Sequence, residues 1–331
     1  MKRQDTSVKK PPKAVARVER SSGFARAFLA VFLLLFSVAA LLPDPVVNGL
    51  SRFTAVSSGL VLRFIGLSAV VRGRYLALDQ FRVEIVPECT ALYLIVLFVA
   101  FVLAWPASAR KKGCGLLAGM VLLPAINALR IAAVVYVGSV SLEAFHILHT
   151  YMGQVVMMLA VIGLCLAWAR WEAGEPSLSH LPVAWKRLVL VSAALFAGWL
   201  LVDKAYVAMN DALVEAWLSW QGREIILQRR HLLYFETFNL PFFISLTLAA
   251  QRTRPARMAK CLLLGTLAIW FSHVLFRLGN AYLMLYGQDL IFLLTNNIAL
   301  LSQYLLTFVL WYVLLFRQRE KIKELSPSTP D

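Results

Sequence analysis

Long apolar runs alternate with short polar and basic stretches along most of the chain. A helix needs roughly 20 mainly apolar residues to cross a bilayer, so these runs predict transmembrane spans. We expect about eight spans, over Phe28–Leu42, Thr90–Pro106, Gly115–Val137, Thr150–Trp168, Leu188–Tyr206, Leu232–Ala250, Cys261–Leu285 and Leu290–Phe316. The predicted fold is an all-α polytopic membrane protein, a helical bundle with a small extracytoplasmic segment.

Residues 44–88 follow a different pattern. The stretch VVNGLSRFTAVSSGLVLRFIG is long enough for a span, but Arg52, Arg63 and several serines interrupt it. Its large apolar residues recur at helical spacings and form one stripe: Leu50, Phe53, Leu60 and Phe64. This pattern predicts a helix that lies in the membrane interface. The following RYLALDQFRVEIV alternates in part with period two, which predicts a short hairpin or extended segment.

Composition and charge agree with a membrane protein. The 331 residues are 60% hydrophobic and only 15% charged, whereas a soluble domain carries about a quarter of charged residues. The net charge of +15 would suggest nucleic acid as a partner in a soluble protein. Here the basic residues cluster between apolar runs and no aromatic residues are interleaved with them, so we expect contact with membrane lipid and no nucleic acid.

The basic clusters also predict the topology. With the N-terminus in the cytoplasm, residues 110–112, 170–187, 252–260 and 317–323 all fall inside, provided that residues 44–88 stay outside. The start lacks a cleavage site for a signal peptide. We therefore expect five segments: a basic disordered cytoplasmic tail (1–24), a membrane core (25–172), a polar cytoplasmic linker (173–187), a C-terminal membrane domain (188–317) and a cytoplasmic tail (318–331).

Of the four cysteines, only Cys89 is expected on the oxidising side, so a disulfide partner is lacking. A lone cysteine in apolar sequence is most often inert packing. However, Pro87 suits the first position of a helix, which would place Cys89 in the first turn beside unpaired N–H groups that favour a thiolate. Glu88 opposes this by charge repulsion, so the pattern leaves the thiol pKa open.

Arg130 and two histidines are expected at the same membrane depth. A helix that starts near Gly113 and rises about 1.5 Å per residue brings Arg130 close to the outer face. A membrane arginine marks a site or an ion pair, or snorkels to the interface. His146 and His149 precede the next span and could be polar caps or a metal-binding pair. Further ligands are lacking nearby, so we expect no metal and no cofactor.

Together these residues match one kind of chemistry. Acyl transfer through a thioester needs a thiol that attacks the carbonyl, a cation that stabilises the oxyanion or thiolate, and a group that moves the proton to the leaving amine. Cys89, Arg130 and His149 would fill these three roles. The sequence has neither G-x-S-x-G nor H-E-x-x-H, which argues against serine or metal-dependent proteolysis.

Residues from about 25 to 172 resemble the exosortase/archaeosortase family of multi-pass membrane cysteine transpeptidases, and are nearest to the exosortase H type. The resemblance rests on Cys89 in PECTALYL, on NALRI at Asn127–Ile131, and on His149 in HTYMGQ. It departs from the family at Ala91, where a glycine is frequent. His146 could replace His149, although TYMGQ after His149 agrees with the family segment.

The resemblance implies a function. Such enzymes process exported proteins that carry a C-terminal signal made of a short motif, a transmembrane helix and a basic tail. It therefore implies a thiol protease or transpeptidase of the bacterial inner membrane, with both termini in the cytoplasm and the catalytic residues Cys89, Arg130 and His149 facing the periplasm. The alternatives are a transporter, which would typically show duplicated halves, and an inactive accessory subunit, which Ala91 would suit.

The second half of the chain carries polar residues within its apolar runs. His273, Arg277 and Asn280 share one helix face, and Glu236 is a candidate ion-pair partner for Arg277. Polar packing between helices explains such residues, and a groove for a substrate helix is the alternative.

Overall fold

The computed structural model describes residues 13–149, 153–174, 185–223, 226–227, 237–250, 253–287, 289–311 and 313–314. This part of the chain is mainly helical. Its helices are α1 (Lys13–Ala40), α2 (Asp44–Phe64), η1 (Pro87–Thr90), α3 (Leu92–Ala104), α4 (Ala109–Val140), α5 (Leu142–Ile147), α6 (Gly153–Ala173), α7 (Trp185–Trp220), α8 (Asn239–Leu248), α9 (Pro255–Tyr286), α10 (Asp289–Leu301), η4 (Ser302–Leu306) and α11 (Thr307–Trp311).

Five helices of the described part are long and apolar enough to cross a membrane: Gly23–Ala40, Ala109–Val140, Val155–Glu172, Lys186–Trp220 and Pro255–Tyr286. Shorter apolar helices, Leu92–Ala104, Asn239–Leu248 and Leu290–Leu301, fall within the three other expected spans. The prediction of an all-α polytopic membrane protein is confirmed. The number of eight spans stays a prediction.

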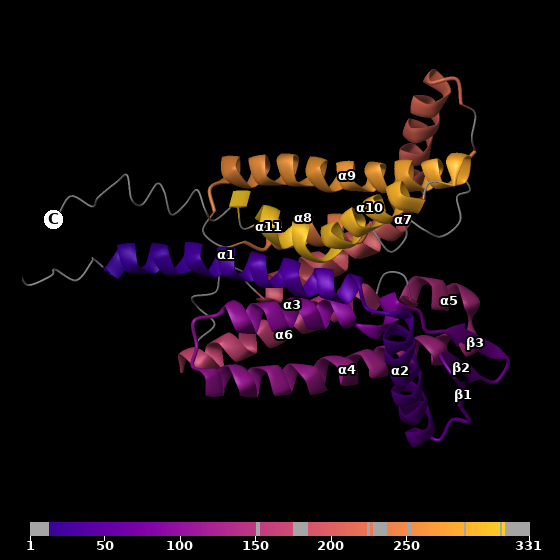
Figure 1. Cartoon of the computed structure of the whole chain (residues 1–331), viewed down its shortest axis with the longest axis horizontal. Coiled ribbons are helices and arrows are strands. Elements are labelled where there is room, and N and C mark those ends of the chain that lie inside the picture. The colour runs from indigo at the N-terminus through magenta and orange to yellow at the C-terminus, as the bar shows by residue number, and fades with distance from the viewer. Residues whose placement is uncertain are drawn as a thin grey trace, which may run out of the picture.

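The two halves of the chain pack against each other and share an apolar core, with α3 in contact with η4. Figure 1 shows α1 between α3, α4 and α6 on one side and α8, α9 and α11 on the other. The largest core cluster joins Phe32 and Phe36 of α1 and Leu97 of α3 to Phe242 of α8 and Leu305 of η4. The N-terminal core and the C-terminal membrane domain therefore share one apolar interior.

Helix α1 begins at Lys13, before the expected span. The division of the chain into segments, with a basic tail over residues 1–24, stays a prediction. The segment KAVARVER has strong helix formers and lacks glycine, and prolines stand directly before it, where a helix start tolerates them. Residues 1–12 lie outside the described part, as do residues 318–331 and most of the linker.

Helix α2 has the amphipathic pattern that the sequence predicts, with small residues facing the protein. Ser51, Ala55, Ser58 and Gly59 are among its buried residues. Its large apolar residues Phe53, Leu60 and Phe64 are exposed, whereas Leu50 is half-buried. Figure 1 shows α2 running across the ends of the long helices. An exposed apolar stripe on such a helix supports its expected position in the membrane interface.

A three-stranded antiparallel sheet follows α2, made of β1 (Val70–Arg72), β2 (Tyr75–Leu78) and β3 (Phe81–Glu84). This confirms the extended segment and adds a third strand to the expected hairpin. Leu76 and Leu78 belong to the same buried cluster as Ile131 and Val135 of α4. The sheet therefore packs on α4, and β3 leads directly into η1.

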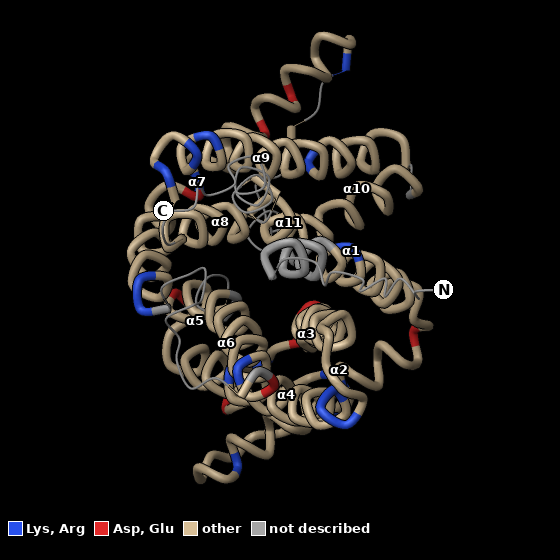
Figure 2. The backbone as a smooth tube through the Cα atoms, turned by 90° about the vertical axis from the view of Figure 1, so that its left-hand side faces the viewer, with Lys and Arg blue, Asp and Glu red and all other residues tan. Residues whose placement is uncertain are grey.

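Basic residues lie at the opposite end of α4 from the sheet. Lys111 pairs with Glu172 at 3.6 Å, and the Trp168 indole donates to the Lys111 carbonyl at 3.3 Å. These contacts fix the α3–α4 turn against the end of α6. Figure 2, viewed toward this end, shows charged residues as short segments on mainly uncharged helices.

Candidate active site

Cys89 lies in η1, a short 3₁₀ turn between β3 and α3. Val86 before it is extended and Pro87 takes the first position, as expected. The Cys89 N–H donates to the Val86 carbonyl at 2.9 Å, and the Thr90 hydroxyl donates to the Pro87 carbonyl at 2.7 Å. The helix of the span begins only at Leu92. Our prediction that Cys89 occupies the first turn of that helix is therefore wrong.

The turn is held by its own backbone and by α4. Ala91 adopts a left-handed conformation, with φ 59° and ψ 12°, which separates η1 from α3. The Asn127 side-chain amide donates to the Cys89 carbonyl at 2.7 Å, and Asn127 is buried. Asn127 thus joins α4 to the backbone of the cysteine. The sequence gave one indication of this role, because the polar side chain of Asn127 stands in an apolar span nearly one helical turn before Arg130.

Arg130 lies on the same helix and is half-buried. Its guanidinium interacts with the Cys89 thiol through both charge and a hydrogen bond. The same guanidinium acts electrostatically on the His149 imidazole. The structure therefore brings together the thiol, the guanidinium and the imidazole that the sequence singled out.

His149 follows α5 directly and lies against an aromatic residue of that helix. Its imidazole stacks on the Phe145 ring, with centroids 5.2 Å apart and planes at 6°. Phe145 in turn meets the edge of Phe81 from β3 at 5.0 Å. His146 is exposed. Of the two histidines, His149 is the half-buried one on which Arg130 acts.

Burial keeps both titratable groups neutral near pH 7. Desolvation raises the pKa of the Cys89 thiol above its usual value, although Arg130 opposes this. Desolvation and the nearby Arg130 charge lower the pKa of His149 to about 4. Both groups lie outside the spanning helices. The resting site therefore holds a thiol and a neutral imidazole, rather than the thiolate that a helix dipole would favour.

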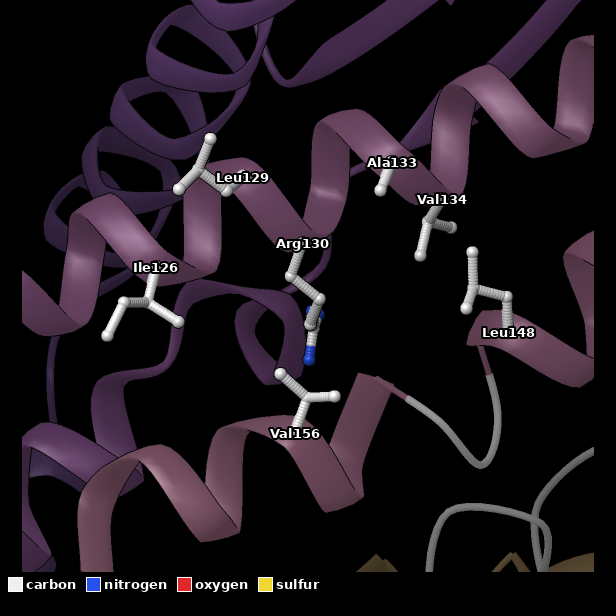
Figure 3. A pocket seen from close by; sticks show the side chains of 7 residues that line it. All are labelled: Ile126, Leu129, Arg130, Ala133, Val134, Leu148 and Val156. Atoms are coloured by element: carbon white, nitrogen blue, oxygen red, sulfur yellow. The ribbon is translucent and has the colours of Figure 1, made fainter. Parts of the chain in front are cut away.

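A groove of about 230 Å³ opens beside Arg130. Figure 3 shows the Arg130 side chain extending from α4 toward Val156 of α6. Apart from Arg130, the groove is lined by apolar residues: Ile126, Leu129, Ala133, Val134, Leu148 and Val156. Such a lining suits an apolar peptide segment. The described residues contain no group of three or more His, Cys, Asp or Glu side chains able to hold a metal ion.

A second set of buried polar residues lies in the C-terminal domain. His273 contacts the Tyr206 hydroxyl at 2.7 Å and the Asn239 side-chain oxygen at 2.9 Å. Arg277 pairs with Asp211 of α7 at 2.5 Å. Glu236, the partner that we considered for Arg277, lies outside the described residues. These contacts join α7, α8 and α9 and fit the expected polar packing between helices.

The fold and site define a helical membrane protein in which a cysteine, an arginine and a histidine from three elements meet at one end of the bundle. Residues 20–166 match the model of a family described as transmembrane exosortase, of the EpsH type. This part of the chain is similar to the transmembrane exosortase family. The similarity supports a general role as a membrane transpeptidase in protein sorting. Comparisons with curated proteins and with solved structures gave no match.

Proposed function

We propose that the protein is a cysteine transpeptidase or protease that cleaves the C-terminal sorting signals of exported proteins at the outer face of the bacterial inner membrane. The observation that supports this most is the position of Arg130, whose guanidinium acts on both the Cys89 thiol and the His149 imidazole. A residue with only a packing role needs neither contact. The similarity of residues 20–166 to the transmembrane exosortase family supports the same reaction class.

The reaction begins from the neutral thiol and the neutral imidazole. Cys89 sulfur forms a bond to the scissile carbonyl carbon while His149 takes the thiol proton. Arg130 stabilises the negative charge that develops on the carbonyl oxygen. The carbon–nitrogen bond then breaks, and the leaving amine takes the proton from His149. Water or an acceptor nucleophile attacks the thioester and releases Cys89.

The groove beside Arg130 suits the substrate that this reaction needs. Its apolar lining would hold the residues next to the scissile bond, where the transmembrane helix of the sorting signal begins. The basic residues 110–112 lie near the start of α4, away from Arg130, and the positive-inside rule favours the cytoplasm for that end. Both termini would then be cytoplasmic and Cys89 would face the periplasm.

Intact-mass analysis of a co-expressed substrate tests the proposal. The substrate is an exported protein with a C-terminal motif, a transmembrane helix and a basic tail. Wild type should shorten it, and Cys89→Ala should leave it at full length. Cys114→Ala is the matched control, because Cys114 is an exposed cysteine near the other end of α4. Shortening by Cys89→Ala at the wild-type rate would overturn the proposal.

A trapping experiment separates an active enzyme from an inactive accessory subunit. Rapid acid quenching of the wild-type enzyme with its substrate should catch the thioester before water or the acceptor attacks it. Intact mass of the enzyme should then show a substrate fragment attached to Cys89 that hydroxylamine removes. A fragment attached equally to Cys89→Ala would contradict the thioester mechanism.

A further inference from the structure

Three arginines line a groove on the segment that carries α2 and the sheet. The groove holds about 470 Å³ and lies between the first half of α2 and the β1–β2 turn. Its arginines are Arg52 on α2, Arg72 on β1 and Arg74 in the turn; Asn48 and Tyr75 also line it. We call it the arginine groove. It lies outside the set of residues that the proposed reaction uses.

The turn that supplies two of the arginines has a defined geometry. Arg72 and Tyr75 are paired across the β1–β2 ladder, so the turn consists of Gly73 and Arg74. Gly73 has φ +60°, which a type II′ turn requires of its first central residue and which glycine adopts at little cost. The turn and the first half of α2 therefore form two walls of one basic groove.

Only one of the three arginines in the arginine groove forms a salt bridge among the described residues. Arg74 pairs with Glu84 at 2.5 Å and donates to the Asn48 side-chain oxygen at 3.3 Å. These contacts fix the turn against α2. Neither Arg52 nor Arg72 forms a salt bridge within the described residues, and both are exposed. Two guanidiniums are thus left for an external anion.

The surroundings identify the kind of anion. Arg52 is next to Phe53, and Val46 lies two residues before Asn48; both apolar side chains are exposed. A helix of this kind lies at the level of the lipid headgroups, with its apolar residues among the acyl chains. Guanidinium groups bind phosphate with paired, charge-assisted hydrogen bonds. A phospholipid satisfies both requirements, since it supplies a phosphate and adjacent acyl chains.

We propose that the arginine groove binds the phosphate of an anionic phospholipid on the outer surface of the membrane. Basic residues are normally scarce in outer segments, because the positive-inside rule places them in the cytoplasm. Arginines gathered here in one groove therefore indicate a ligand. An acidic peptide would match the charge but leaves the adjacent apolar side chains without a partner. The proposal does not depend on the proposed reaction, but it rests on the proposed topology, which places residues 44–88 outside.

Lipid binding to the full-length protein in detergent tests this. Native mass spectrometry should show phosphatidylglycerol bound to wild type, with affinity about tenfold weaker in Arg52→Gln/Arg72→Gln, because two charge-assisted contacts are lost. Arg254→Gln/Arg257→Gln is the control, since it removes the same charge from residues outside the groove. It should change the affinity less than about twofold.

A second variant protects the test against misfolding. Arg52→Lys/Arg72→Lys keeps the charge but loses the paired donors, so its affinity should fall between those of wild type and the Gln variant. Equal affinity of all variants, or an equal loss in the control pair, would overturn the proposal. Glycerol phosphate that binds as tightly as the lipid would reassign the groove to a soluble phosphate. Binding of an acidic peptide in place of the lipid would reassign it to a protein segment.

Discussion

Arg130 has two roles in the proposed site, and each depends on the shape of the guanidinium. A lysine keeps the charge but has a single ammonium, which cannot present paired donors to a thiol and to a developing oxyanion. We therefore expect Arg130→Lys to lower kcat/KM for substrate processing by about 100-fold, a loss typical of one oxyanion donor. Rates from intact-mass time courses measure this. Processing within twofold of wild type would contradict the oxyanion role.

The pH dependence follows from the neutral resting state. His149 must be neutral to accept the thiol proton, and its pKa is lowered to about 4. The pKa of Cys89 is raised. Hence kcat/KM should rise as pH increases through about 4 and stay level from about pH 5.5 to pH 8. A profile of kcat/KM in liposomes checks this. A rise of kcat/KM centred near about pH 6.5, the ordinary histidine pKa, would contradict a buried, neutral imidazole.

Ala91 occupies a backbone conformation that suits glycine better than alanine. Its φ of 59° is a left-handed conformation that costs a non-glycine residue about 1 kcal/mol or more. Ala91→Gly should therefore raise the unfolding temperature by a few degrees, because relief of the backbone strain outweighs the added freedom of the unfolded chain. Thermal unfolding in detergent measures this, with Ala125→Gly on α4 as a control that should lower it. A lower unfolding temperature for Ala91→Gly than for wild type would show that alanine does not strain the backbone of this turn.

Sequence reasoning reached the three main residues of the site because each interrupts an apolar pattern at the same predicted depth. It singled out Asn127 only as part of the NALRI segment, and Phe145 not at all. Asn127 contacts a backbone carbonyl 38 residues away, so the sequence does not show its partner. Phe145 is an ordinary apolar residue until the fold stacks it on His149.

At the scale of elements, the contact between α4 and the sheet positions His149. A Cβ atom added at Gly138 would collide with the Phe81 ring, which contacts Phe145. Gly138→Ala should therefore displace Phe81 and the Phe145–His149 stack, and lower processing about tenfold while the fold persists. Gly113→Ala is the control on the same helix, because nothing lies within 4 Å of its added Cβ. Equal activities of the two variants would contradict the positioning role of this contact.

The elements that sequence reasoning placed well are those with strong periodicity. Helix α2 and the extended segment after it were predicted, since their patterns of 3.6 and 2 residues are distinct. The short turn η1 was missed because PECTALYL reads as a continuous helix start. Its break depends on the left-handed Ala91, and alanine itself favours a helix.

At the scale of the molecule, sequence reasoning divided the chain at the polar linker into two membrane units. The structure packs the two units against each other with a shared core, through α3 and η4. Composition can mark a boundary in the chain, but it carries no information on whether the apolar faces of the two parts meet. The polar contacts of α7, α8 and α9 then become part of the interior of one bundle.

The Asp211–Arg277 pair tests how much that interior depends on its polar contacts. Both side chains are almost fully buried, so removing either one leaves an uncompensated charge among apolar residues. We expect Asp211→Leu or Arg277→Met alone to lower the free energy of unfolding by about 3–5 kcal/mol. The double variant removes both charges and should recover most of that loss. Denaturant unfolding in mixed micelles measures all three variants.

The same series distinguishes packing from function in the C-terminal domain. If the pair serves only to hold α7 against α9, the double variant should process substrate at the wild-type rate once it is folded, because the two charges lie on α7 and α9 and the proposed reaction does not use them. A stable double variant that no longer processes substrate would instead assign the pair to substrate binding. Losses that simply add in the double variant would contradict the pairing itself, since coupled charges give a non-additive cycle.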